Sequence, residues 1–116
     1  MAKLPDAESA YIDPGKIAGY LLSETHPRGR LKAAFFRRFG FSAGHPGVFA
    51  EALLNHARSH DLAGAVETAF GIHYIIEGAI ETPDKRNPVV RTVWVIKTGE
   101  TLPRFVTATP VRKGSK

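Results

Sequence analysis

The stretch VVRTVWVIK, residues 89–97, carries the strongest strand signal in the chain. It is rich in β-branched and aromatic residues and contains no glycine or proline, which is the composition that strands prefer. Because side chains alternate along a strand, Thr92 and Trp94 share one face, and Arg91 and Lys97 share the other. Trp94 has the largest apolar area, so its face is predicted to lie against the core.

Three further strand patterns surround this stretch. A cluster of turn residues precedes it at 82–88, and a second turn follows at 98–101. Gly71 interrupts an apolar run and predicts a hairpin. The expected strands, in chain order, are Ala65–Phe70, Ile72–Ile80, Val89–Lys97 and Leu102–Thr109. The short connections between them predict a four-stranded antiparallel meander.

Helices are predicted before residue 64, where apolar residues recur at helical spacing. The expected helices are Gly15–Leu22, Arg28–Phe39 and Val48–His60. Gly40 follows the second of them, at a position where glycine is the usual C-cap. The predicted fold class is therefore α+β, with about three N-terminal helices packed on one face of the meander. We expect one domain over residues 1–110 and a basic, disordered tail over residues 111–116.

The composition limits the classes of protein to consider. The chain has 116 residues, 43% of them hydrophobic, which is enough for one core, and it has no cysteine for disulfides or zinc. No apolar run reaches the length of a membrane span and no signal peptide is evident, so we expect a cytoplasmic protein without a membrane partner. The 16 Lys and Arg residues outnumber the 11 Asp and Glu residues, and the net charge of +5 is compatible with nucleic acid as a partner.

The second predicted helix, within HPRGRLKAAFFRRFGF at residues 26–41, combines phenylalanines with basic side chains. Leu31, Phe35 and Phe39 are spaced four apart and predict an apolar stripe that faces the core, and Phe36 widens it. Basic side chains occupy the rest of the helix surface: Arg28, Arg30, Lys32, Arg37 and Arg38. An anion such as a phosphate would be favoured at the helix N-terminus, near Arg28 and Arg30. A solvated helix face with carboxylate partners explains the same pattern equally well.

The strands predict a second polar cluster. His73, Glu77 and Arg91 are expected on the sheet face away from Trp94, where His73 has a plain interpretation as a surface residue between strands. In the last strand, alternation separates Arg104 from Thr107 and Thr109, and the pattern leaves open which set faces out.

Known catalytic and cofactor motifs are missing from the sequence. It contains no Walker loop, no GxGxxG and no GxSxG. His56 and His60 lie four apart on the third predicted helix, but no HExxH pattern surrounds them and no third ligand is evident. We therefore expect neither a metal site nor a cofactor.

The chain resembles a bacterial domain family of about this length, over roughly residues 4–110. The matching stretches are Leu4-Pro-Asp-Ala7, Gly19-Tyr-Leu-Leu22, His26-Pro-Arg-Gly-Arg30 with Lys32 and Phe35-Phe36, Gly40-Phe41, Thr82-Pro-Asp84, Arg91-Thr-Val-Trp94 and Pro103-Arg-Phe-Val-Thr-Ala-Thr-Pro110. Thr109 departs from the pattern, which would have an aromatic residue there. Such domains resemble effector modules of bacterial toxin or phage-head proteins, and small proteins encoded beside an immunity partner. The architecture is also similar to that of the barnase–EndoU–colicin–RelE nuclease toxins, which cut RNA without a metal.

One functional hypothesis is therefore a small metal-independent ribonuclease of the toxin-effector type. Cleavage of an RNA phosphodiester needs proton-transfer groups and cations or donors around the phosphate. The residues predicted for catalysis are His26, Lys32, Arg91 and Thr107. The residues predicted to bind nucleic acid are Arg28, Arg30, His73, Arg104 and Thr109. The expected partners are RNA and a cognate immunity or antitoxin protein.

The alternative is a non-catalytic module that binds nucleic acid or a protein, as an accessory protein of a toxin–immunity or phage locus. Such a module needs the basic surface but no aligned proton-transfer pair. Convergence of His26, Lys32, Arg91 and Thr107 in one cleft would favour catalysis, and their scatter over opposite faces would favour binding.

Overall fold

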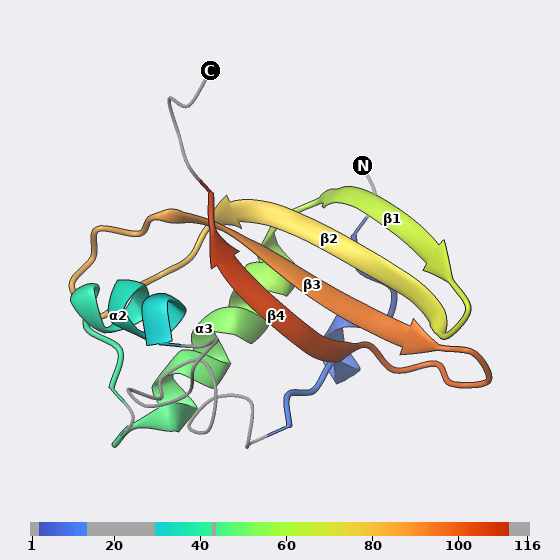
Figure 1. Ribbon diagram of the computed structural model, residues 1–116, viewed down its shortest axis with the longest axis horizontal. Coiled ribbons are helices and arrows are strands. Elements are labelled where there is room, and N and C mark those ends of the chain that lie inside the picture. Colours follow the sequence, from blue (N-terminus) through green and yellow to red (C-terminus); the bar gives the residue numbers. More distant parts are fainter. Residues whose placement is uncertain (1–2, 14–29, 43, 112–116) are drawn as a thin grey trace.

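The computed structural model describes residues 3–13, 30–42 and 44–111, with side chains from residue 33 onward in the first α-helix (Figure 1). The elements are η1 (Ala7–Ser9), α2 (Arg30–Arg38), α3 (Pro46–Ser59), β1 (Leu62–Thr68), β2 (Gly71–Ala79), β3 (Val89–Lys97) and β4 (Arg104–Pro110). The strands form one antiparallel sheet in the order β1-β2-β3-β4. The predicted α+β meander is thus confirmed. The described residues contain two α-helices rather than three, and the segment predicted for the first, Gly15–Leu22, lies outside them.

The core lies between the helices and one face of the sheet. Figure 1 shows α3 lying across this face, with α2 beside the connection between β2 and β3. Trp94 is fully buried, as are Phe36 of α2 and Phe49 of α3. The Phe36 and Phe49 rings lie 4.7 Å apart, and the Trp94 and Phe105 rings lie 5.3 Å apart. The prediction that Trp94 and Thr92 face the core is confirmed.

The end of α2 shows how local sequence positions the core. Gly40 has φ 106°, and its N–H donates to the Arg37 carbonyl at 3.0 Å. The Phe41 N–H donates to the Phe36 carbonyl at 3.3 Å, which completes the pair of hydrogen bonds typical of a glycine C-cap. The chain therefore turns back at Gly40, and the Phe41 ring packs 4.5 Å from the Phe49 ring.

The residues of the predicted apolar stripe of α2 are buried to different depths. Phe36 is fully buried, whereas Phe35 and Phe39 are only half-buried. The reason is that Ala33, three residues before Phe36, is also buried and allows α2 to approach the core along the line of these two residues. Phe39 lies instead beneath the Arg86 guanidinium, 4.4 Å from its ring centroid.

The strand boundaries also differ in detail. β1 begins at Leu62, three residues before the predicted start, because Leu62 pairs with Ile76 on the far side of a register shift. At its other end the sheet extends beyond α3 (Figure 1), and Phe70 in the β1–β2 turn is 75% exposed. None of the helices in the described part of the chain is long and apolar enough to cross a membrane.

Candidate functional site

The strand residues that the sequence predicted for the site lie on the face of the sheet opposite the core. We call it the outer face. Its residues align in rows across the strands: Glu77, Arg91 and Thr109 in one row, Ile75, Val93 and Thr107 in the next, and Val66, His73, Val95 and Arg104 in the third. Five residues that the sequence predicted as site residues therefore share this face: His73, Arg91, Arg104, Thr107 and Thr109.

A β-bulge in β4 produces this grouping. Phe105 pairs with Trp94 and Thr107 pairs with Val93, so Val106 is an extra residue between them. Phe105 and Ala108 are consequently both buried on the core face, although regular alternation would place them on opposite faces. The same extra residue returns Arg104 to the outer face together with Thr107.

Arg91 and Glu77 form an ion pair in the first row. The Arg91 guanidinium donates from Nε at 2.6 Å and from Nη2 at 2.5 Å to the same carboxylate oxygen of Glu77. Both side chains are partly exposed, at 50% for Arg91 and 35% for Glu77, so the pair contributes little to stability. Its main effect is to hold the guanidinium in one position beside Thr109. Alternation along β2 predicted Glu77 on this face, but no sequence pattern marked Glu77 as a functional residue.

His73, in the third row, has a buried ring nitrogen that lacks a hydrogen-bond partner among the described residues. The residue as a whole is half-buried, and this nitrogen is Nδ1. A buried ring nitrogen without a partner is costly, so a ligand or a water molecule would be favoured there. Across β3 from His73 lie the buried Val95 and then Arg104.

Arg104 is held at the edge of the sheet by the N-terminal segment. Tyr11 donates its N–H to the Pro103 carbonyl at 3.1 Å and accepts the Phe105 N–H at 3.0 Å. These two backbone bonds lie on either side of Arg104 and support the β4 edge next to the third row.

The outer face thus holds two polar clusters instead of one cleft. His73 and Glu77 are four residues apart on β2, which corresponds to about 13 Å along a strand. Glu77, Arg91 and Thr109 form the first cluster. His73 of β2 and Arg104 of β4 form the second, with Val95 of β3 between them.

The remaining predicted site residues belong to the segment before the sheet. His26 and Arg28 lie outside the described residues. Arg30 and Lys32 belong to the first turn of α2, of which only the backbone is described at these positions. Since α2 packs Phe36 into the core, it lies on the side of the sheet opposite Arg91.

His56 and His60, considered above as a metal pair, bind backbone carbonyls instead. His56 Nε2 lies 3.1 Å from the Gly78 carbonyl oxygen, and His60 Nε2 lies 2.8 Å from that of Ala79. Gly78 leaves no room for a side chain, because a Cβ atom there would lie 2.5 Å from the His60 ring. No group of three or more His, Cys, Asp or Glu side chains suited to a metal ion occurs in the described ranges.

The chain was compared with curated proteins, with solved structures and with protein-family models. A search of curated proteins found no match. Among solved structures, the chain is similar to a chain of a contact-dependent growth inhibition toxin–immunity protein complex from Klebsiella pneumoniae 342, with a TM-score of 0.66 and 21% sequence identity. The similarity covers 86% of this chain and 98% of that chain, and at this identity it concerns the fold. The sequence also matches a family model, described as a domain of unknown function (DUF6883), over residues 3–112, and the chain therefore belongs to that family.

Proposed function

We propose that the domain acts in a bacterial toxin–immunity system, as a small metal-independent ribonuclease whose site is the outer face of the sheet. The observation that carries this proposal is the bulge at Val106, which gathers Arg104, Thr107 and Thr109 on the face of Arg91. The fold likeness to a chain of a toxin–immunity complex supports the toxin-related role. A cognate immunity protein is the partner that this role implies.

The proposed reaction is attack of a ribose 2′-hydroxyl on the adjacent phosphate, with departure of the 5′-oxygen. In this proposal Glu77, the carboxylate that pairs with Arg91, accepts the 2′-hydroxyl proton while Arg91 binds the phosphate. Thr107 and Thr109 donate hydrogen bonds to the developing charge on the phosphate. His73 and Arg104 lie one cluster away and bind the next part of the RNA strand. Lys32 belongs to α2, on the other side of the sheet, and takes no part in this site. A role of His26 in proton transfer to the leaving 5′-oxygen stays a prediction, since His26 lies outside the described residues.

RNA cleavage by the purified protein in excess chelator tests this proposal. Transfer RNA and messenger RNA are supplied as substrates, and 2′,3′-cyclic phosphate ends are measured as the product. We expect cleavage that survives chelation and is lost in Glu77→Gln and Arg91→Ala. Lys85→Ala serves as the matched control, since it removes an exposed cation from a connection outside the strands. Full activity of both site variants, or no activity of the parent with any substrate, would contradict the proposal.

A second candidate function is a non-catalytic module that binds nucleic acid or an acidic protein. The placement of α2, with Lys32, on the side of the sheet opposite Arg91 and Thr107 favours it, because a binding module does not need these residues to converge in one cleft. This module would bind RNA without cleaving it, and binding would weaken in Arg91→Ala and Arg104→Ala alike. Parallel binding and cleavage measurements on the same variants distinguish the two functions.

A further inference from the structure

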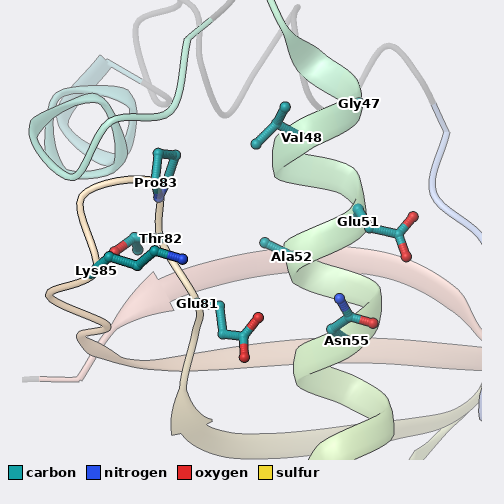
Figure 2. Close-up of a pocket in the computed structure, with 9 residues that line it drawn as sticks. All are labelled: Gly47, Val48, Glu51, Ala52, Asn55, Glu81, Thr82, Pro83 and Lys85. Atoms are coloured by element: carbon teal, nitrogen blue, oxygen red, sulfur yellow. The ribbon is translucent and has the colours of Figure 1, made fainter.

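A groove runs along α3 on the side that faces the connection between β2 and β3, residues 80–88 (Figure 2). It consists of a hollow of about 490 Å³ and an adjoining one of about 250 Å³, which share Asn55 and Glu81 in their walls. The α3 wall presents residues at helical spacing, from Val48 through Ala52 and Asn55 to Ser59. The groove lies on the helical side of the sheet, away from the outer face.

The wall opposite α3 is a fixed connection. The Arg86 guanidinium donates to an Asp84 carboxylate oxygen at 2.6 Å and to the Arg38 carbonyl at 2.7 Å. The Thr82 hydroxyl donates to the other Asp84 oxygen at 2.7 Å. Together with the Arg86–Phe39 contact, these bonds tie the connection to the C-terminal end of α2.

Two residues of this connection have left-handed backbone conformations. Lys85 has φ 68°, which is unfavourable for a lysine, and Asn87 has φ 50°, which asparagine adopts more readily than most residues. Both residues also line the groove. Unfavourable backbone conformations held by surrounding bonds occur often at binding sites. The Lys85 side chain points toward α3 (Figure 2).

Two opposite charges enter the groove without pairing. Figure 2 shows the Lys85 ammonium directed toward Ala52 and the Glu81 carboxylate lying near Asn55. Both residues are exposed, and neither forms an ion pair with another residue in the described part of the chain. Glu51 also lines the groove but extends away from the connection.

The groove therefore has an order along α3. Val48 and Pro83 form an apolar end, Lys85 follows, and Glu81 with Asn55 comes next (Figure 2). At 1.5 Å per residue, Val48 to Ser59 spans about 16 Å, the length of roughly five residues of an extended chain. Side chains two apart in such a chain point the same way, about 7 Å from one another.

We propose that this groove binds an extended segment of a protein partner that presents an apolar, an acidic and a basic side chain in that order. The acidic side chain meets Lys85, and the basic side chain meets Glu81. The Asn55 amide and the side-chain NH2 of Asn87, whose Oδ1 already accepts from the Thr82 N–H, bind the backbone of the segment. An open, elongated groove with alternating charge fits an extended chain better than a small molecule, which pockets normally enclose. The proposal does not depend on ribonuclease activity.

Selection from a phage-displayed library of random peptides of about eight residues tests the site before any partner protein has been identified. The bait is the full chain, and the comparison bait is the charge-exchanged variant Glu81→Lys/Lys85→Glu. The full chain is expected to enrich peptides with an apolar, an acidic and a basic residue at alternate positions, in either chain direction. The charge-exchanged variant is expected to enrich peptides in which the acidic and basic positions are exchanged.

Titration of a selected synthetic peptide then measures the effect by fluorescence anisotropy. The charge-exchanged variant should bind it about tenfold more weakly or worse, because like charges face each other. The matched control Lys97→Glu/Glu100→Lys makes the same exchange in and beside the β3–β4 turn, and should keep the affinity within about twofold. Circular dichroism establishes that both variants fold. The proposal is overturned if the full chain enriches no peptides, or if both baits enrich the same ones.

Discussion

At the scale of single residues, His56 couples α3 to the sheet through a buried network of hydrogen bonds. The Trp94 indole N–H donates to the Thr92 hydroxyl at 3.0 Å, and this hydroxyl donates to His56 Nδ1 at 3.1 Å. His56 Nε2 then donates to the Gly78 carbonyl. Every polar group in this network has a partner only when His56 is neutral, since a proton on Nδ1 would leave the Thr92 hydroxyl hydrogen without its acceptor.

The charge state of His56 predicts a dependence of stability on pH. Burial, opposed in part by the hydrogen bond to Gly78, lowers the pKa of His56 from 6.5 to about 4. Because the folded state binds the proton less well than the unfolded state, the contribution is complete above pH 6.5 and decreases as the pH falls toward 4. We expect the free energy of unfolding to drop by about 2–3 kcal/mol between pH 7 and pH 4.5 from this group.

Urea unfolding of the parent and of His56→Gln at both pH values measures this contribution. The variant lacks the titrating group, so its free energy of unfolding should change less between the two pH values. An equal change in parent and variant would mean that other groups cause the pH dependence.

At the scale of elements, the bulge in β4 is the feature that determines which side chains share a face. Val106 is the extra residue, and Phe105 and Thr107 on either side of it retain their partners on β3. Removing Val106 would therefore leave a regular strand in which Phe105 and Ala108 still face the core.

Deletion of Val106 is accordingly expected to be tolerated, with a loss of about 1–2 kcal/mol or less in the free energy of unfolding. The matched control is deletion of Val93, because β3 pairs with β2 without a register shift and its deletion moves half of the strand to the wrong face. Thermal unfolding and amide NMR spectra of both variants measure the outcome. Loss of folding in the Val106 deletion would show that the bulge itself, and not only the face assignment, is needed.

At the scale of the whole molecule, one core joins both α-helices to the sheet, and Trp94 is its largest fully buried side chain. Trp94→Ala is expected to lower the free energy of unfolding by about 3–5 kcal/mol, through lost burial and the cavity left behind. Trp94→Phe should lower the free energy of unfolding by less than Trp94→Ala, because it keeps most of the apolar volume, although it also loses the hydrogen bond to Thr92. Urea unfolding gives both values, and a red-shifted native tryptophan emission in the parent would contradict the burial.

The charge distribution of the molecule leads to a prediction about salt. If the outer face binds RNA as proposed, Arg91→Ala should reduce the slope of log affinity against log salt by about 0.7, for one lost phosphate contact. Lys85→Ala should leave the slope unchanged, since Lys85 lies in the groove on the helical side. Fluorescence anisotropy with a single-stranded RNA over a series of salt concentrations measures both slopes. Equal slopes for the parent and Arg91→Ala would exclude a phosphate contact at Arg91.

Features that depend on neighbours in the chain were determined by the sequence itself. Residues 89–97 form β3 with the predicted bounds, because β-branched and aromatic residues favour a strand wherever it packs. Gly40 ends α2 as predicted, because the left-handed conformation at a C-cap suits a residue without a Cβ atom. The helices-first order and the meander follow from such local signals.

The composition of the candidate site was decided only by the tertiary structure. Alternation separated Arg104 from Thr107, and they share the outer face because β4 accommodates Val106 as an extra residue opposite β3. Phe36 is buried more deeply than Phe35 because of how α2 meets the core, and Glu77 becomes a site residue because the register of β2 and β3 places it opposite Arg91. Each of these outcomes depends on contacts between residues far apart in the chain, whose energies no local pattern contains.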